Sequence, residues 1–174
     1  MKKKKNTWII QIFMWTFLLS ILFSYTTNII SIKSNMISTA IIIIIVIFVG
    51  IMFDMLGTAA LTGNEATFHA KNAKKIKGAK LAIKFIKNNV RVSSICNDII
   101  GDICGIVSGG LGAVLAIDVA AYFNISITLV TIIIAAIISS LTVGGKAIFK
   151  SIAYKNADKI LFSVSRSLSF FKRK

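Results

Sequence analysis

The stretch that decides the fold is residues 37–61, ISTAIIIIIVIFVGIMFDMLGTAAL, an apolar run interrupted by one carboxylate, Asp54. A helix rises about 1.5 Å per residue, so this run is long enough to cross the roughly 30 Å of hydrocarbon in a bilayer. The whole chain of 174 residues has 56 % hydrophobic residues and a mean hydropathy of +0.82. This composition predicts an all-α, polytopic membrane protein with about four transmembrane helices.

Three further apolar runs lie outside that stretch, at residues 8–25, 92–122 and 125–143. The first follows Lys2–Lys5, as in a cleavable signal peptide, but no clear small-residue cleavage site comes after it, which favours a retained signal anchor. The second is longer than a bilayer requires, and its segment Ser108–Gly112 predicts a bend or an unwound turn. The third is expected to end before Gly144.

The formal net charge of +15 is gathered between the apolar runs. The positive-inside rule places Lys2–Lys5, residues 62–91 and the tail from Lys146 in the cytoplasm, so both termini are predicted to be cytoplasmic at the cell membrane. The chain then divides into a signal anchor (1–30), a three-span core with a basic cytoplasmic segment (31–150) and a basic juxtamembrane helix (151–174). A nucleic-acid binder would instead carry its charge on a soluble fold.

Two basic segments are also amphipathic. One is residues 79–87, and the other is the tail, where Ile160, Val164, Leu168 and Phe171 recur at helical spacing. We expect helices lying on the cytoplasmic membrane surface, attracted to anionic lipids. Simple anchoring of the fold accounts for the pattern equally well.

Three aspartates, Asp54, Asp98 and Asp102, interrupt the predicted spans, where no Lys or Arg is expected to balance them. Asp54 precedes Leu61 by seven residues and Asp98 follows Arg91 by seven, so both are predicted about 10 Å from the cytoplasmic boundary, with Asp102 one turn deeper. A carboxylate inside a bilayer costs several kcal/mol and persists mainly where it binds an ion, relays a proton or lines water. We therefore expect an ion or proton site here.

Neutral oxygen ligands surround these carboxylates in the sequence. Asn97 and Ser94 precede Asp98, and Glu65 is expected at the cytoplasmic mouth as a gate or a helix cap. Such an all-oxygen set fits a hard divalent cation, Mg²⁺ above all. A zinc site is not expected, because His69 is the sole histidine.

Other interpretations of the aspartates remain open. Asp98 and Asp102 could be protonated and hydrogen-bond between helices without binding any ion. The chain would then be a membrane scaffold or regulator that transports nothing. An enzyme is not expected, because the sequence offers no nucleophile–base pair, histidine cluster or phosphate loop.

A family resemblance rests on three elements: Thr62-Gly63-Asn64-Glu65-Ala66, the basic segment 71–91, and either Cys96-Asn97-Asp98 or Gly101-Asp102. In this order they resemble the transmembrane domain of the CorB/CorC and cyclin M magnesium transporters, over roughly residues 37–165. The resemblance implies a homodimer that binds Mg²⁺ between its helices, coupled to Na⁺ or protons. Family members usually continue into CBS domains, which are not expected in this chain.

Overall fold

The computed structural model describes residues 2–32 and 35–171, and within these ranges it is helical without a strand. The helices are α1 (Lys2–Ile32), α2 (Met36–Thr62), α3 (Glu65–Ala73), α4 (Ala79–Lys87), α5 (Asn89–Ser93), the π-helix η1 (Ser94–Gly101), α6 (Asp102–Phe123) and α7 (Ile127–Phe171). Four helical stretches are long and apolar enough to span a membrane: Ile10–Thr27, Met36–Thr62, Asn89–Phe123 and Ile127–Phe170. The prediction of an all-α, multi-pass membrane protein is confirmed.

The fourth predicted span is longer than the sequence indicated. Helix α7 passes through Gly144 and Gly145 without a break and continues to Phe171, with one non-helical residue at Asn156 (φ −126°, ψ 27°). A glycine costs only about 1 kcal/mol inside a helix, and packing can offset that cost. At Gly145 an added Cβ would lie 2.3 Å from Ile51 Cδ1, so this glycine permits close approach of α7 to α2.

The irregular part of the third span is also not where we expected it. The predicted bend at Ser108–Gly112 is wrong, because α6 is a continuous α-helix there. Gly112 packs against α7, since an added Cβ would lie 2.3 Å from Ile138 Cδ1. The departure from α-helical geometry falls instead on η1, a π-helix of eight residues. Such helices are rare and are frequently found at functional sites.

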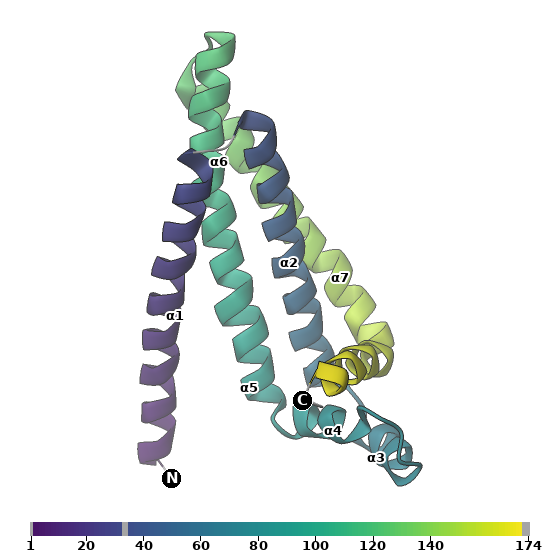
Figure 1. Cartoon of the computed structure of the whole chain (residues 1–174). Helices are drawn as coiled ribbons and strands as arrows, with labels where there is room; N and C mark the ends of the chain where they lie inside the picture. The colour runs from purple at the N-terminus through teal and green to yellow at the C-terminus, as the bar shows by residue number, and fades with distance from the viewer. Residues whose placement is uncertain (1, 33–34, 172–174) are drawn as a thin grey trace. The chain divides into compact units, whose positions relative to one another are not determined.

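The chain forms two compact units, each assembled from distant segments. Unit 1 comprises Met1–Gly50 and Ile99–Gly144, and unit 2 comprises Ile51–Asp98 and Gly145–Lys174. In unit 1, α1 packs along α6 (Figure 1). These units are defined by packing, and the division into consecutive segments stays a prediction.

Unit 2 has a hydrophobic core built from four helices. Phe68 of α3 and Leu161 of α7 are fully buried in it, and Ile83 and Ile86 of α4 pack around them. Small residues of α2 and α7 complete the core: Ala59, Ala60, Ala153 and Ala157. This core fixes the end of α2 against α7, which positions the site described below.

The two amphipathic segments therefore pack on protein. Helix α4 turns Ala79, Ala82, Ile83 and Ile86 inward, and its lysines remain exposed. In the tail, the buried residues are Ala153, Ala157, Leu161 and Ser165, one position away from the predicted apolar stripe. Of that stripe, Ile160 and Val164 are half-buried, Leu168 is exposed, and the Phe171 side chain lies outside the described residues. Attraction to anionic lipids stays a prediction.

The turn before α4 depends on Gly78. Its φ of +92° is in the left-handed region, and an added Cβ would lie 2.8 Å from the backbone N and Cα of Arg166. We expect Gly78→Ala to lower the free energy of unfolding by about 2 kcal/mol, because strain and a backbone clash add together. Denaturant or thermal unfolding of the purified protein measures this loss.

Gly109→Ala is the matched control for that prediction. Gly109 lies within α6, and an added Cβ would find no heavy atom within 4 Å. This change is expected to leave stability unchanged or to raise it by up to about 1 kcal/mol. Equal stability of the two variants would contradict the account of the Gly78 turn.

Candidate functional site

The best-buried carboxylate of the predicted site, that of Asp54, pairs with a lysine. Asp54 lies on α2 in unit 2 with 4 % of its side chain exposed, and Lys150 Nζ of α7 lies 3.3 Å from its Oδ2. This corrects the expectation that no basic side chain balances the intramembrane aspartates. The expectation was wrong because we ended the fourth span at Val143, whereas α7 continues past Lys150.

The register of two parallel helices brings this pair together. The contact of Gly145 with Ile51 and that of Gly63 with Leu161 show that α2 and α7 run in the same direction. Lys150 lies five residues beyond Gly145, and Asp54 lies three residues beyond Ile51. Because side chains on a helix tilt toward its N-terminus, the long lysine side chain points back to the level of Asp54.

The ion pair leaves the carboxylate incompletely satisfied. Asp54 Oδ2 is buried and accepts no hydrogen bond, so Lys150 approaches it without hydrogen-bond geometry. The hydroxyl of Thr58 donates to the backbone carbonyl of Asp54 at 2.9 Å and not to its carboxylate. Because this oxygen has an ion-pair partner but accepts no hydrogen bond, it is a candidate ligand.

A second buried oxygen without a hydrogen bond belongs to Asn97 of η1. The Asn97 amide nitrogen donates to Ser93 Oγ at 3.2 Å, which turns the amide oxygen in the opposite direction. There it packs against Gly57 of α2, where an added Cβ would lie 2.0 Å from Asn97 Oδ1. This oxygen has no hydrogen-bond partner. Gly57 thus lets the π-helix approach α2 closely.

These two oxygens belong to the same neighbourhood of unit 2. Asp54 and Gly57 are three residues apart on α2, so they share one face of the helix. Asp54 provides a negative oxygen at this face, and Asn97 provides a neutral one where it packs on Gly57. Carboxylate and amide oxygens are the ligands that hard cations such as Mg²⁺ prefer.

The remaining predicted ligands are placed differently. Ser94 is half-buried at the start of η1, and Asp98, on the same π-helix, is exposed. Asp102 is also exposed and belongs to unit 1, at the start of α6. Among the described residues, no three His, Cys, Asp or Glu side chains are grouped so that they could hold a metal ion. The three-carboxylate site, with Asn97, Ser94 and Glu65 as further ligands, stays a prediction.

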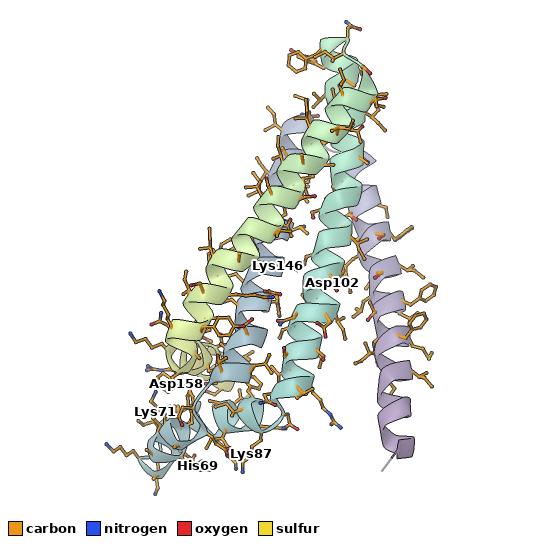
Figure 2. The ribbon with its side chains drawn as sticks, turned by 180° about the vertical axis from the view of Figure 1, so that it is seen from behind. His69, Lys71, Lys87, Asp102, Lys146 and Asp158 are labelled. Carbon is orange, nitrogen blue, oxygen red and sulfur yellow. The ribbon has the colours of Figure 1, made fainter. Side chains whose placement is uncertain are left out.

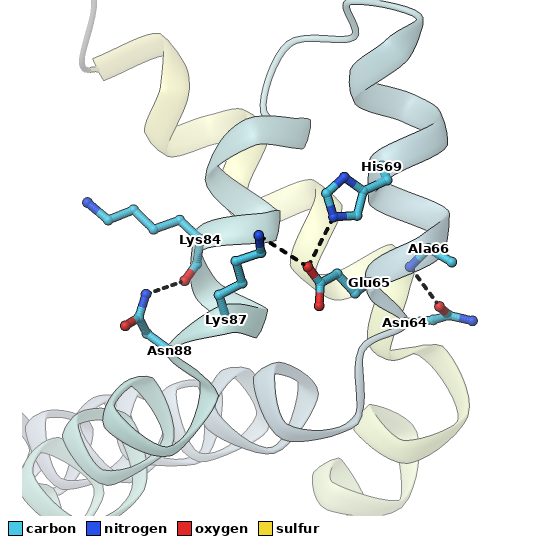
Figure 3. A network of polar contacts seen from close by, with 7 residues as sticks. All are labelled: Asn64, Glu65, Ala66, His69, Lys84, Lys87 and Asn88. Atoms are coloured by element: carbon cyan, nitrogen blue, oxygen red, sulfur yellow. Dashed lines mark hydrogen bonds and ion pairs between the residues drawn. The ribbon is translucent and has the colours of Figure 1, made fainter.

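Glu65 takes part in a separate polar network on α3 and α4 (Figure 3). Its Oε1 lies 3.0 Å from His69 Nε2 and 3.6 Å from Lys87 Nζ. The hydrogen bond with His69, aided by the positive charge of Lys87, lowers the pKa of Glu65 below its ordinary value. The capping bond of α3 is made by Asn64, whose Oδ1 accepts from the Ala66 N–H at 3.0 Å. Glu65 occupies the first turn, where a negative charge is favourable.

Contacts with α7 hold the turn between α2 and α3. The backbone N–H of Asn64 donates to Asp158 Oδ1 at 2.8 Å. Lys71 Nζ lies 5.0 Å from the Phe68 ring and 4.5 Å from the Phe162 ring, within cation–π range. Figure 2 shows His69, Lys71, Lys87 and Asp158 at this end of unit 2. The motif Thr62–Ala66 thus forms a turn that α7 fixes in place.

Comparison with known families identifies the family of the chain. Residues 41–173 match the sequence model of the cyclin M transmembrane N-terminal domain. The chain belongs to this family. No curated protein and no solved structure showed significant similarity to the chain. The cyclin M family is a transporter family associated with divalent cations, Mg²⁺ in particular, and not an enzyme family. The matched region contains both Asp54 and Lys150.

Two residues of the cyclin M-type domain that contact the predicted ligands were not predicted from the sequence. Lys150 was assigned to the cytoplasmic tail, and Ser93, which orients the Asn97 amide, was not considered. One signal for Lys150 was available: Ala147-Ile148-Phe149 continues the apolar character beyond Gly145. If the helix had been continued through the two glycines, Lys150 would have been assigned to the fourth apolar helix and not to the cytoplasmic tail. No comparable signal singles out Ser93.

Proposed function

We propose that this chain binds Mg²⁺ within the membrane and transports it, with Asp54 as the charged ligand and Asn97 as a neutral ligand. The observation that carries the proposal is a pair of buried oxygens, Asp54 Oδ2 and Asn97 Oδ1, that accept no hydrogen bond, in a domain of a transporter family. Mg²⁺ usually keeps several of its waters and takes only one or two carboxylates from a protein, so a site with few protein ligands is sufficient.

The other predicted residues would act along the route of the ion. Asp98 and Asp102 are exposed and would attract cations to the site, with Ser94 as a further neutral oxygen. Glu65 would lie at the cytoplasmic mouth, where its low pKa keeps it negative. With Glu65 on the cytoplasmic side of the membrane, both termini would also be cytoplasmic. The exposed lysines of the α3–α4 region would then face anionic lipid head groups: Lys74, Lys75, Lys77, Lys80 and Lys84.

A membrane scaffold or regulator that moves no ion is the second candidate. The ion pair between Asp54 and Lys150 favours it, because an internal ammonium already neutralises the carboxylate. A buried pair of this kind is able to hold two helices in register without any ligand. Binding and flux must therefore be measured separately.

The test uses the full chain, purified and reconstituted. Calorimetry with MgCl₂ measures binding, and a Mg²⁺-sensitive dye trapped in proteoliposomes measures flux. We expect millimolar or tighter binding together with flux above that of empty vesicles, and a several-fold lower flux for Asp98→Asn. Binding without flux, or no binding at all, would favour the scaffold. Unchanged flux in Asp98→Asn would remove Asp98 from the proposed route.

A further inference from the structure

We propose that Lys150 is a tethered counter-ion that competes with Mg²⁺ for Asp54 and so sets the affinity and the charge selectivity of the site. This inference rests on the proposed function, because it assumes that Asp54 binds a cation. It concerns the lysine that the ion would have to displace. Lys150 would then be a specificity-determining residue of the same site.

The Lys150 ammonium group lies against the candidate ligand oxygen of Asp54. Lys150 Nζ is 3.3 Å from Asp54 Oδ2, the buried oxygen that accepts no hydrogen bond and is the candidate ligand. A cation bound to that oxygen would place two positive charges within a few ångströms of each other, where repulsion is strong in a poorly hydrated environment. Mg²⁺ and the ammonium group therefore cannot occupy this position together.

The Lys150 side chain is able to leave the ion pair, whereas the Asp54 side chain is held in place. The Lys150 side chain is 41 % exposed, so its ammonium group has room to move away from Asp54 by a change of rotamer. The Asp54 side chain is 4 % exposed and stays enclosed between its neighbours. The pair also lacks hydrogen-bond geometry, which makes it weaker than a well-formed buried ion pair. Displacement is then a local movement of one side chain.

The tethered ammonium group also affects which cations bind to Asp54. Because it is tethered, the ammonium group is present at a high effective concentration next to the carboxylate. A monovalent ion that replaces it brings the same charge and must also be drawn from solution, so it gains little. A divalent ion brings twice the charge to the buried carboxylate and gains more Coulomb energy. The tethered lysine thus lowers the affinity for every cation by the same factor, so that monovalent ions, which gain less Coulomb energy at the carboxylate, no longer bind at concentrations where Mg²⁺ still does.

The main experiment titrates MgCl₂ into the full chain in detergent and compares three proteins by calorimetry. Lys150→Met removes the ammonium group and keeps the length of the side chain. Lys155→Met makes the same change at an exposed position five residues further along α7. We expect Lys150→Met to bind Mg²⁺ at least about fivefold more tightly than the wild type, and Lys155→Met to bind like the wild type. Added NaCl should compete with Mg²⁺ more strongly in Lys150→Met than in the wild type.

A second measurement needs no variant and so does not depend on the folding of Lys150→Met. An amine-reactive reagent is applied to the wild type with and without MgCl₂, and mass spectrometry compares labelling of Lys150 with that of Lys155. We expect Mg²⁺ to raise the labelling of Lys150 relative to Lys155, because the displaced amine enters water. Unchanged or reduced relative labelling under conditions where Mg²⁺ binds would overturn the inference.

The outcomes separate this inference from the proposed function. Mg²⁺ binding of equal affinity in the wild type and in Lys150→Met would overturn the role of Lys150 and leave the proposed site standing. Equal competition by NaCl in these two proteins would overturn charge selectivity. Absence of Mg²⁺ binding in both proteins would overturn the proposed function and the inference with it.

Discussion

Phe68→Ala is expected to lower the free energy of unfolding by about 3–5 kcal/mol, the largest stability loss that we predict. The Phe68 side chain is completely buried in the core of unit 2, where it packs with Leu161 and the inward face of α4. Its removal leaves a cavity that the surrounding helices fill only in part. It also removes the ring that Lys71 contacts at 5.0 Å. Unfolding of the purified protein in detergent, followed by circular dichroism, measures the loss.

Phe170→Ala is the matched control, because the same side chain is deleted from an exposed position near the end of α7. The Phe170 ring has a cation–π contact with Lys77 at 5.7 Å, so the expected loss is below about 1 kcal/mol. Losses of similar size in the two variants would show that Phe68 does not lie in a packed core. The assembly of unit 2 around α3 would then need to be reconsidered.

Asp54→Asn is expected to weaken Mg²⁺ binding by at least about tenfold while leaving the fold intact. Asparagine keeps the shape of the side chain and one oxygen but removes the charge that attracts the cation. The cost to stability is expected to be within about 1 kcal/mol, because an incompletely satisfied buried charge disappears and Lys150 is exposed enough to turn to water. Calorimetry with MgCl₂ and thermal unfolding of the same preparation separate binding from folding.

Asp118→Asn provides the comparison for that prediction. Asp118 also lies within a long apolar helix, but it is exposed, and it was not assigned to the site. This variant should bind Mg²⁺ as the wild type does. If Asp54→Asn bound Mg²⁺ with unchanged affinity, or if both variants lost affinity equally, Asp54 would not be the charged ligand.

The spans could be predicted from the sequence because the hydrophobic effect determines them residue by residue. Helix α2 begins and ends within one residue of the predicted stretch 37–61. The end of α7 could not be predicted in this way, because Gly144 and Gly145 are a common signal for the end of a helix. Whether a glycine ends a helix or permits close packing depends on a partner that hydropathy does not reveal, in this case Ile51.

Only part of the candidate site could be predicted from the sequence, because hydropathy reveals polar residues in apolar runs but not how helices pack. Asp54 and Asn97 were predicted as ligands because polar residues inside apolar runs are costly, and this cost is visible in the sequence; their role as ligands stays a prediction. Lys150 was not identified, because its pairing with Asp54 depends on the register of α7 against α2. The buried side of the tail was missed as well, because small residues such as Ala157 and Ser165 pack helices closely without raising the hydropathy.

The central claim is that Asp54 and Asn97 provide oxygens to a divalent cation, and a crystal structure of the full chain with Mn²⁺ tests it most directly. Mn²⁺ prefers the same oxygen ligands as Mg²⁺ and gives an anomalous signal. We expect an anomalous peak at coordination distance from Asp54, about 2.1 Å as for Mg²⁺, beside the Asn97 amide oxygen, with the Lys150 ammonium group turned away. A structure at saturating Mn²⁺ with no peak at Asp54, and with Lys150 still paired to it, would contradict the account.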